Sequence, residues 1–315
     1  MRVAYDTTLR ARLAGELHSL TIIDRYNLVD DAWNEVVAGR LGAADFLTFV
    51  DGFTNERELA VWQAIAAGLR GVGRLIDLDS ATHARFRQRV AALVRPVLDD
   101  VQWKPAKGDD DLRAKLRGLL LSLLATLADD HEAQGYCRDL LDHGTTDPEL
   151  LSAATLAVAA SGTDADFDRF VEGFRNAATP QDMLRCLYAL AEFPEQRHVE
   201  RAVEFAFSGE VKTQNAPFLI HRCIANRAHG NVAWQMLRRR WTEANDRFPS
   251  NTIVRMIDPV KLLNTDNVSA DVQAFFSEHP IPQGATTLDQ VLERQRVNVA
   301  VRAREHDMLT NALVD

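Results

Sequence analysis

The residues that come nearest to a catalytic motif are His131 and Glu132. Zinc peptidases commonly place two histidines one helical turn apart with a glutamate between them, so that both imidazoles face the metal and the acid activates water. In this sequence Gly135 occupies the position of the second histidine. None of the nine histidines has another histidine three or four residues away, so we expect no metal ligands in this chain.

Other catalytic chemistries are equally poorly represented. Cys137, Cys186 and Cys223 lie far apart without a Cys-x-x-Cys spacing, and we expect them to be reduced and buried rather than to form disulfides or bind zinc. The glycines of Gly68–Gly73 have the wrong order for a dinucleotide-binding loop, and neither a Gly-x-Ser-x-Gly elbow nor a phosphate-binding Gly-Lys-Ser/Thr loop occurs. The sequence therefore predicts no catalytic residues and an isolated chain without enzymatic activity.

The composition excludes several classes of partner. The chain has 315 residues, a net charge of −9 and a pI of about 5.5, so no overall basic field attracts nucleic acid or an anionic membrane. The longest nearly apolar run, Gly118–Ala128, is about half of what a membrane-spanning helix needs. The N-terminus has no signal-peptide core, so we expect a cytoplasmic protein. Its cations are mostly arginine, which is typical of GC-rich bacterial genomes.

Helices are expected almost throughout. Leucines from Leu112 to Leu127 recur at steps of three and four, which predicts one face of a single helix, and Asp109–Asp111 stand where carboxylates favour a helix N-terminus. Thr179–Asp182 combines a capping hydroxyl, a proline at the first helical position and an acid that can bond back to the cap. Asp147–Glu149 is a similar start signal. These signals divide the chain into helices of about 10 to 18 residues joined by short turns.

A dozen or more short helices exceed what one bundle core buries, so antiparallel helix pairs stacked into a solenoid fit this length better. We therefore predict an all-α fold, an α-solenoid of the HEAT or armadillo kind, although no strict repeat period is found. Trp103–Asp111 is the best candidate for an internal loop and for a separator of two lobes. Only Met1–Tyr5 alternates like a strand, and without a nearby partner strand it resembles the end of a sheet that lies elsewhere.

Several stretches, taken in order, carry a family resemblance. Arg2-Val3-Ala4-Tyr5-Asp6 is similar to an arginine-valine-x-tyrosine-aspartate that ends a β-sandwich and enters a helical domain. Asp24–Trp33 is similar to an arginine-x-x-leucine-aspartate-aspartate-alanine segment. The remaining matches are Ala38–Gly39, Thr179–Asp182, Val211–Asn215, Asn226–Trp234, Leu292–Glu293 and Asn298. The ordered set resembles the C-terminal helical domain of the aminopeptidase N family of zinc metallopeptidases, which the endoplasmic-reticulum aminopeptidases share.

The resemblance implies that this chain is part of a larger enzyme. Residues 1–6 would end an upstream β-sandwich and residues 7–315 would form the helical domain. In that family the zinc and its ligands belong to an upstream catalytic domain, so zinc is expected in the parent enzyme and no cofactor in this chain. The implied role is to cap the active-site cavity and to help select the peptides from which N-terminal residues are removed. The implied partners are the upstream domains and the peptide substrate.

The resemblance also indicates substrate-binding residues. Arg255 aligns with a position from which related domains direct a polar or cationic side chain toward the active site, and a guanidinium there would pair with a peptide carboxylate or carbonyl. Lys212 and Gln214 are the next candidates. Asn215 replaces an acid of the family pattern, and Val301 stands near a frequent tryptophan, so packing in those turns is expected to differ.

Two other interpretations stay open. The first is a freestanding helical-repeat scaffold that binds a protein or peptide partner and has no peptidase attached, in which case Met1 is a natural start. The second is an all-helical enzyme that uses dispersed carboxylates such as Asp30–Asp31, although these pairs stand at predicted helix edges where solvation explains them.

Overall fold

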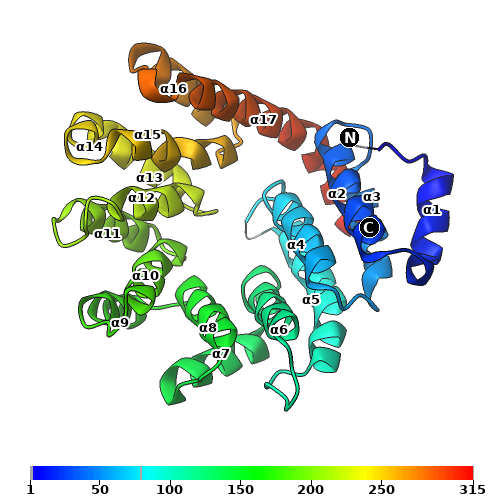
Figure 1. Ribbon diagram of the computed structural model, residues 1–315. Coiled ribbons are helices and arrows are strands. Elements are labelled where there is room, and N and C mark those ends of the chain that lie inside the picture. The colour runs from blue at the N-terminus through cyan, green and yellow to red at the C-terminus, as the bar shows by residue number, and fades with distance from the viewer. Residues whose placement is uncertain (1–2, 79, 315) are drawn as a thin grey trace. The chain divides into compact units, whose positions relative to one another are not determined.

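The computed structural model describes residues 3–78 and 80–314, and within these ranges the chain forms seventeen α-helices and no β-strand (Figure 1). The predicted all-α class is confirmed. The helices group into two compact units, one made of Met1–Ala157 with Val301–Asp315 and the other of Val158–Ala300. We call them unit 1 and unit 2. Each has its own buried apolar core.

Unit 1 packs most of its helices against near neighbours in sequence. Its main contacts join the second helix to the fourth and the fifth to the sixth. The end of the last helix of the chain, from Val301 onward, also belongs here. There Glu305 is buried and accepts a hydrogen bond from the backbone N of Ala43 at 2.8 Å, while Arg302 donates to the carbonyl of Arg74 at 3.1 Å. The helices of this unit are α1 Thr7–Gly15, α2 Ile22–Val37, α3 Ala43–Val50, α4 Leu59–Gly73, α5 Ala81–Val101, α6 Asp111–Ser122, α7 His131–His143 and α8 Pro148–Ala160, with 3₁₀ turns η1 Leu17–Ser19 and η2 Asp51–Phe53.

Unit 2 is built from helix pairs that stack side by side, as predicted for a solenoid (Figure 1). One layer contains α9 Asp164–Arg175, α11 Gln196–Phe207, α13 Gly230–Arg239 and α16 Asp266–Glu278, with α14 Trp241–Arg247 after α13. The second layer contains α10 Pro180–Ala189, α12 Ala216–Ala225, α15 Ser250–Ile257 and the first part of α17 Ala285–Val314. The 3₁₀ turns are η4 Leu190–Glu192, η5 Asp258–Leu262 and η6 Pro282–Gly284.

No strict repeat period is apparent in the sequence, but unit 2 has a structural repeat. Successive helices within each layer begin roughly 34 residues apart, which is the length of one helix-pair repeat. Two buried amides stand at equivalent places in it. The side-chain Nδ2 of Asn226 donates to the carbonyls of Ala191 and Phe193 at 2.8 and 3.1 Å. The Nε2 of Gln295 donates to the carbonyls of Val260 and Leu263 at 2.9 and 3.2 Å. Each amide therefore ties a helix pair to the end of the pair before it.

The predicted helix starts are confirmed. The hydroxyl of Thr179 accepts from the backbone N of Asp182 at 3.1 Å at the start of α10, with Pro180 in the first turn. Asp110, the middle residue of the aspartate triplet, caps α6 by accepting from Arg113 N at 2.8 Å. Asp147 accepts from two backbone N–H groups at the start of α8. These caps satisfy amide groups that a helix leaves without an internal partner.

Two details of the leucine-rich region differ from the prediction. The single helix expected through Leu127 ends at Ser122, and Leu123–Leu127 form a π-helical turn. This wider turn changes the angular spacing of the side chains, so the leucines do not keep one face. Leu112 lies in the first turn of α6 and is 58% exposed. The stretch 103–110 is a loop as predicted, but it does not separate two lobes, because α5 and α6 on either side of it both belong to unit 1.

The N-terminal segment forms neither helix nor strand over residues 3–6, and Met1 and Arg2 of the predicted strand lie outside the described residues. Its assignment to the end of an upstream β-sandwich stays a prediction. Among the helices of the described ranges, none combines the length and the apolar character that crossing a membrane requires.

Candidate functional site

Lys212 and Gln214, two of the three predicted substrate-binding residues, lie in the turn that leads into α12 of unit 2. The carbonyl of Lys212 accepts from the backbone N of Asn215 at 2.8 Å and of Ala216 at 3.0 Å, so the turn is held by its own backbone. Both side chains are exposed, and no hydrogen bond or ion pair engages them within the described residues. They are available to a ligand but are not positioned by neighbouring side chains.

Arg255, the third predicted residue, lies in the last turn of α15. Ile253, Met256 and Ile257 of the same helix are buried and hold it in the core, which leaves Arg255 on the exposed side. The Nδ1 of His221 on α12 donates to the backbone carbonyl of Arg255 at 2.8 Å. The guanidinium of Arg255 has no hydrogen bond or ion pair within the described part of the chain. It is therefore a free cation on a fixed helix.

Helix α12 contributes two side chains to this part of unit 2, of which His221 contacts Arg255. Because a carbonyl only accepts, the hydrogen bond to Arg255 places a proton on Nδ1 of His221 and leaves Nε2 with a lone pair in the neutral ring. The next residue, Arg222, lies over the ring of Tyr188 from α10, with its guanidinium carbon 4.9 Å from the ring centre. Burial raises the pKa of Tyr188, and the nearby Arg222 acts in the opposite direction. The Arg222 side chain is 47% exposed, and its guanidinium comes no closer than 4.0 Å to the Glu192 carboxylate.

These four residues form a row across three successive helices of the second layer. Tyr188 contacts Arg222 and His221 contacts Arg255, and each contact joins residues about one repeat apart, so the repeat itself aligns the row. We call this set, Tyr188, His221, Arg222 and Arg255, the cationic row. No described hydrogen bond or ion pair joins Lys212 or Gln214 to it. The sequence analysis missed Tyr188, His221 and Arg222, and their offset of about 34 residues was the signal that could have found them.

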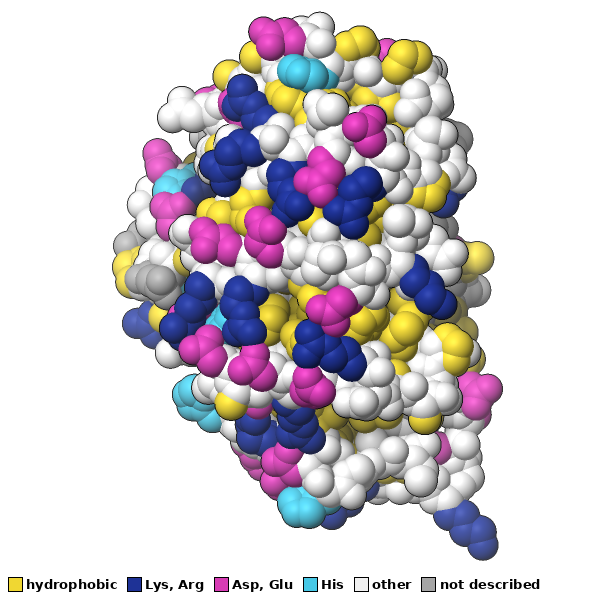
Figure 2. Space-filling view, turned by 90° about the vertical axis from the view of Figure 1, so that its left-hand side faces the viewer, with side chains coloured by type: hydrophobic (Ala, Val, Ile, Leu, Met, Phe, Trp, Pro, Cys, Tyr) yellow, Lys and Arg dark blue, Asp and Glu magenta, His cyan; other side chains and the backbone are white. Residues whose placement is uncertain are grey.

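The first layer of unit 2 contrasts with the cationic row. Figure 2 shows the side of unit 2 that carries α9, α11 and α14, where dark blue and magenta side chains lie next to one another. Arg201 pairs with Asp168 at 2.5 Å, and Arg240 pairs with Glu204 at 2.6 Å and with Glu243 at 2.8 Å. Arg201 and Arg240 therefore both have carboxylate partners. Arg255 in the second layer has none.

The chemistry available to the cationic row is binding rather than bond making. Two guanidinium groups and a phenol can donate hydrogen bonds to carboxylates and carbonyls, and the Nε2 of the neutral His221 ring can accept one. No group of three or more histidine, cysteine or acidic residues within the described ranges is arranged to hold a metal ion. Cys137 and Cys223 are buried, and burial raises the pKa of both thiols, that of Cys137 to about 12, which suppresses the reactive thiolate.

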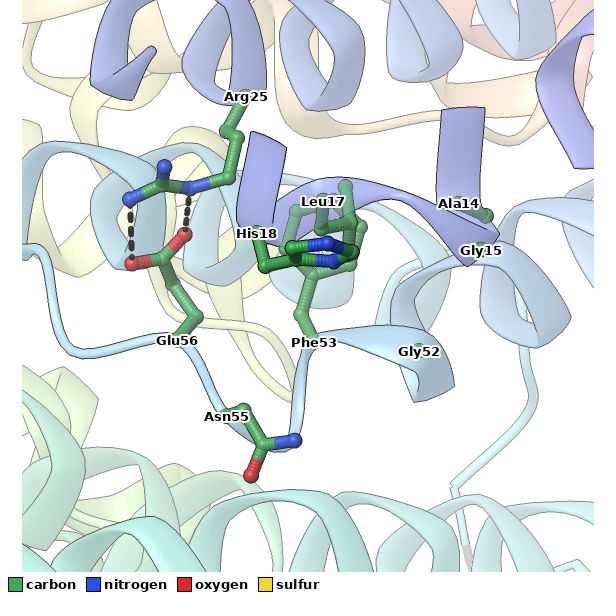
Figure 3. Close-up of a pocket in the computed structure, with 9 residues that line it drawn as sticks. All are labelled: Ala14, Gly15, Leu17, His18, Arg25, Gly52, Phe53, Asn55 and Glu56. Carbon is green, nitrogen blue, oxygen red and sulfur yellow. Dashed lines mark hydrogen bonds and ion pairs between the residues drawn. The ribbon is translucent and has the colours of Figure 1, made fainter. Parts of the chain in front are cut away.

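Two cavities in unit 1 lie apart from the predicted residues. The first, of about 460 Å³, lies between the end of α1 and the turn after α3, and Figure 3 shows nine of the residues that line it. The second, of about 490 Å³, lies between the 105–111 segment and the start of α8, and five of its twelve lining residues are acidic. Arg255, Lys212 and Gln214 line neither cavity.

Comparison with known proteins places the chain in a family. A sequence model described as the ERAP1-like C-terminal domain matches residues 1–297. The chain belongs to this family. It is 26% identical over 310 residues to aminopeptidase M1-A of Oryza sativa subsp. japonica, 27% over 311 residues to aminopeptidase M1 of Arabidopsis thaliana and 24% over 312 residues to aminopeptidase A of Gloydius brevicauda.

The alignments cover the chain and the relatives unequally. Each spans 94 or 95% of this chain but only 32 to 35% of the relative, so the chain spans about a third of the length of the curated relatives it matches. The predicted resemblance to the C-terminal domain of the aminopeptidase N family is confirmed. This ERAP1-like domain accordingly corresponds to one part of a larger, multidomain aminopeptidase architecture.

Proposed function

We propose that residues 7–315 are the non-catalytic C-terminal domain of a zinc-dependent aminopeptidase, and that they cap its active-site cavity and help to select peptide substrates. Residues 1–6 then end an upstream β-sandwich, and upstream residues hold the zinc. The family match and the aminopeptidase names of the relatives support the parent activity. A cytoplasmic location and a bacterial source remain predictions.

The observation that carries the selection role is the free guanidinium of Arg255 on the cationic row. A solvated arginine commonly finds a carboxylate, and the first layer of this unit illustrates that pairing. The Arg255 guanidinium instead has no acid partner within the described residues, and its backbone carbonyl accepts from His221, so Arg255 leaves positive charge on this surface. A peptide with a free carboxylate, or with carbonyls along an extended backbone, complements that charge. Lys212 and Gln214 are proposed as further peptide contacts at the edge of α12.

The test uses the full-length enzyme and peptides of graded length, each made with a free C-terminal carboxylate and as the amide. Arg255→Ala should lower kcat/KM roughly tenfold for a carboxylate peptide that reaches the row, as expected for the loss of one charge-assisted hydrogen bond. It should leave a single-residue chromogenic substrate unchanged. Arg201→Ala is the matched control, since Arg201 is an exposed arginine of the same unit with a carboxylate partner. Lys212→Ala is measured in the same series.

Two results would remove the selection role. One is equal kinetics for Arg255→Ala and the wild type on every peptide, and the other is a uniform loss that includes the single-residue substrate. The freestanding scaffold is the second candidate function, since stacked helix pairs also present peptide-binding surfaces. A stop codon directly upstream of Met1 in the gene would favour it. A reading frame that continues upstream into a histidine-glutamate-x-x-histidine segment would favour the aminopeptidase.

A further inference from the structure

The beginning of unit 1 exposes an unusual number of large apolar side chains. Of the nine such residues of the described chain that are markedly exposed, five fall between residues 3 and 26. Ile23 is 69% exposed and Ile22 45% exposed, both in the first turn of α2. The full set, which we call the α1–α2 surface, is Val3, Leu9, Ile22, Ile23 and Tyr26. Scattered exposed apolar residues are ordinary, but Ile22, Ile23 and Tyr26 gather within the first five residues of α2, and such a group indicates a surface that another surface covers.

Helix α1 itself has little to hold it in place. Only Arg10 of its nine residues is buried, and its apolar residues do not form one side of the helix. Isolated helices shorter than about 12 residues are marginal in water, and most helices in proteins owe their stability to a packed apolar face. Within the described chain α1 lacks such a face. Its stability therefore requires contacts beyond those that unit 1 supplies.

The path of the chain into α1 is nevertheless fixed. Arg10 pairs with the buried carboxylate of Glu35 on α2 and also donates to the carbonyl of Tyr5 at 2.7 Å. Glu35 accepts from the backbone N of Tyr5 at 2.9 Å as well. Burial raises the pKa of the Tyr5 phenol, with further contributions from Asp31, Asp24 and Glu35, so this side chain lies beside α2. The buried ion pair thus fixes where residue 3 and anything before it leave unit 1.

The cavity of Figure 3 lies behind α1. Leu17 and His18 face Phe53 across it, and Arg25 and Glu56 pair at one end, with the Arg25 Nε 2.6 Å from the carboxylate. A Cβ added at Gly15 would meet nothing within 4 Å. Helix α1 and η1 therefore stand away from the rest of unit 1 on this side, which agrees with the low burial of α1.

We propose that the α1–α2 surface is the interface with the part of the same polypeptide that precedes residue 1, and that the Arg10–Glu35 pair sets the angle at which the two join. This inference rests on the proposed function. The chain spans about a third of its relatives and matches a C-terminal domain, so a large preceding part is its expected neighbour. Because that part is covalently joined to this chain, its effective concentration at this surface is high, and a modest apolar area is enough to hold it there.

The test is hydrogen–deuterium exchange of the full-length protein, followed in peptides that cover α1 and the first turn of α2. In the wild type these amides should exchange on the order of 100-fold more slowly than an unprotected chain, because the preceding part covers them. Ile23→Asp should accelerate their exchange by about tenfold or more, since it places a charge in the interface. Leu112→Asp is the matched control: Leu112 is 58% exposed in the same unit but lies on α6. It should leave α1 unchanged, and Ile23→Ala gives a milder variant should the aspartate impair folding.

Three outcomes would overturn the interface. The first is exchange of the α1 amides at the unprotected rate in the wild type, and the second is equal acceleration of that exchange by Ile23→Asp and Leu112→Asp. The third is protection of α1 that grows with protein concentration, which would indicate that a second copy covers the surface. Peptide kinetics are a separate measurement. An active enzyme whose α1 amides are unprotected would refute the interface but not the proposed function. A gene that encodes no segment before residue 1 would refute both the interface and the proposed function.

Discussion

Replacing Asn226 by alanine should destabilise unit 2 more than a typical single substitution. The side chain is 9% exposed and makes four hydrogen bonds. Its Nδ2 donates to the carbonyls of Ala191 and Phe193, and its Oδ1 accepts from the backbone N of Ala228 and of His229, both at 3.0 Å. The substitution removes the partner of all four groups at once.

The expected cost follows from where those four groups lie. Ala191 and Phe193 are buried, so their carbonyls lose a donor that water cannot replace, at about 1–3 kcal/mol each. Ala228 is exposed and His229 half-buried, so water can reach their N–H groups and these add little. We therefore expect Asn226→Ala to lower the free energy of unfolding by at least about 2 kcal/mol. Asn226→Asp should cost at least as much, because its carboxylate would face two carbonyl oxygens instead of donating to them.

The assay is urea unfolding followed by circular dichroism, with hydrogen exchange of residues 196–239 to locate the loss in unit 2. Asn231→Ala is the control, since Asn231 is exposed in the first turn of α13 and its side chain makes no described hydrogen bond. It should change the stability by less than about 0.5 kcal/mol. A loss below about 1 kcal/mol for Asn226→Ala, or equal losses for the two variants, would refute the argument that buried amides tie successive repeats together.

Two other perturbations test the packing and the electrostatics. Gly230→Ala should lower the free energy of unfolding in urea by at least about 2 kcal/mol, because its Cβ would lie 2.2 Å from the backbone carbonyl oxygen of Ile224. Gly135→Ala, whose Cβ would meet nothing within 4 Å, should leave that free energy unchanged or raise it. A larger loss for Gly135→Ala than for Gly230→Ala would contradict the close approach of α12 and α13. His306→Ala should lower the free energy of unfolding by up to about 1 kcal/mol at pH 5.5 and by much less at pH 9. Hydrogen bonds to Asp307 and Asp77 raise the pKa of His306, so the stabilisation by the protonated ring is lost as the pH rises through that raised pKa. A difference between variant and wild type that does not change with pH would exclude this ion pair.

The elements that the sequence predicted well are those set by local chemistry. Thr179 and Asp182 identify the start of α10 because the capping bonds join residues three apart, and Asp110 and Asp147 do the same for α6 and α8. The all-helical class follows from many such signals along the chain. What local patterns could not predict was the end of α6 at Ser122, because the π turn that follows depends on how Leu123 and Leu124 are buried against α5 and α7.

The site was predicted only in part, for a related reason. Arg255, Lys212 and Gln214 came from the family resemblance, and all three are exposed in unit 2, but their role in binding peptides stays a proposal. The neighbours of Arg255 belong to other helices, so no pattern within α15 indicates them. Only the alignment of one repeat with the next places His221 beside Arg255.

The repeat could not be predicted from the sequence, because residues at equivalent positions form the same kind of contact but differ in amino-acid type. Asn226 and Gln295 both donate from a buried amide to two carbonyls at the end of the preceding helix pair, yet they differ in length by one methylene. The row from Tyr188 to Arg255 likewise joins a phenol to a guanidinium in one repeat and an imidazole to a backbone carbonyl in the next. A search that scores identity at a fixed period cannot see these equivalences. A search for buried amides two repeats apart, as Asn226 and Gln295 are, would find them, because the carbonyls left free at a helix end require a donor whatever residue supplies it.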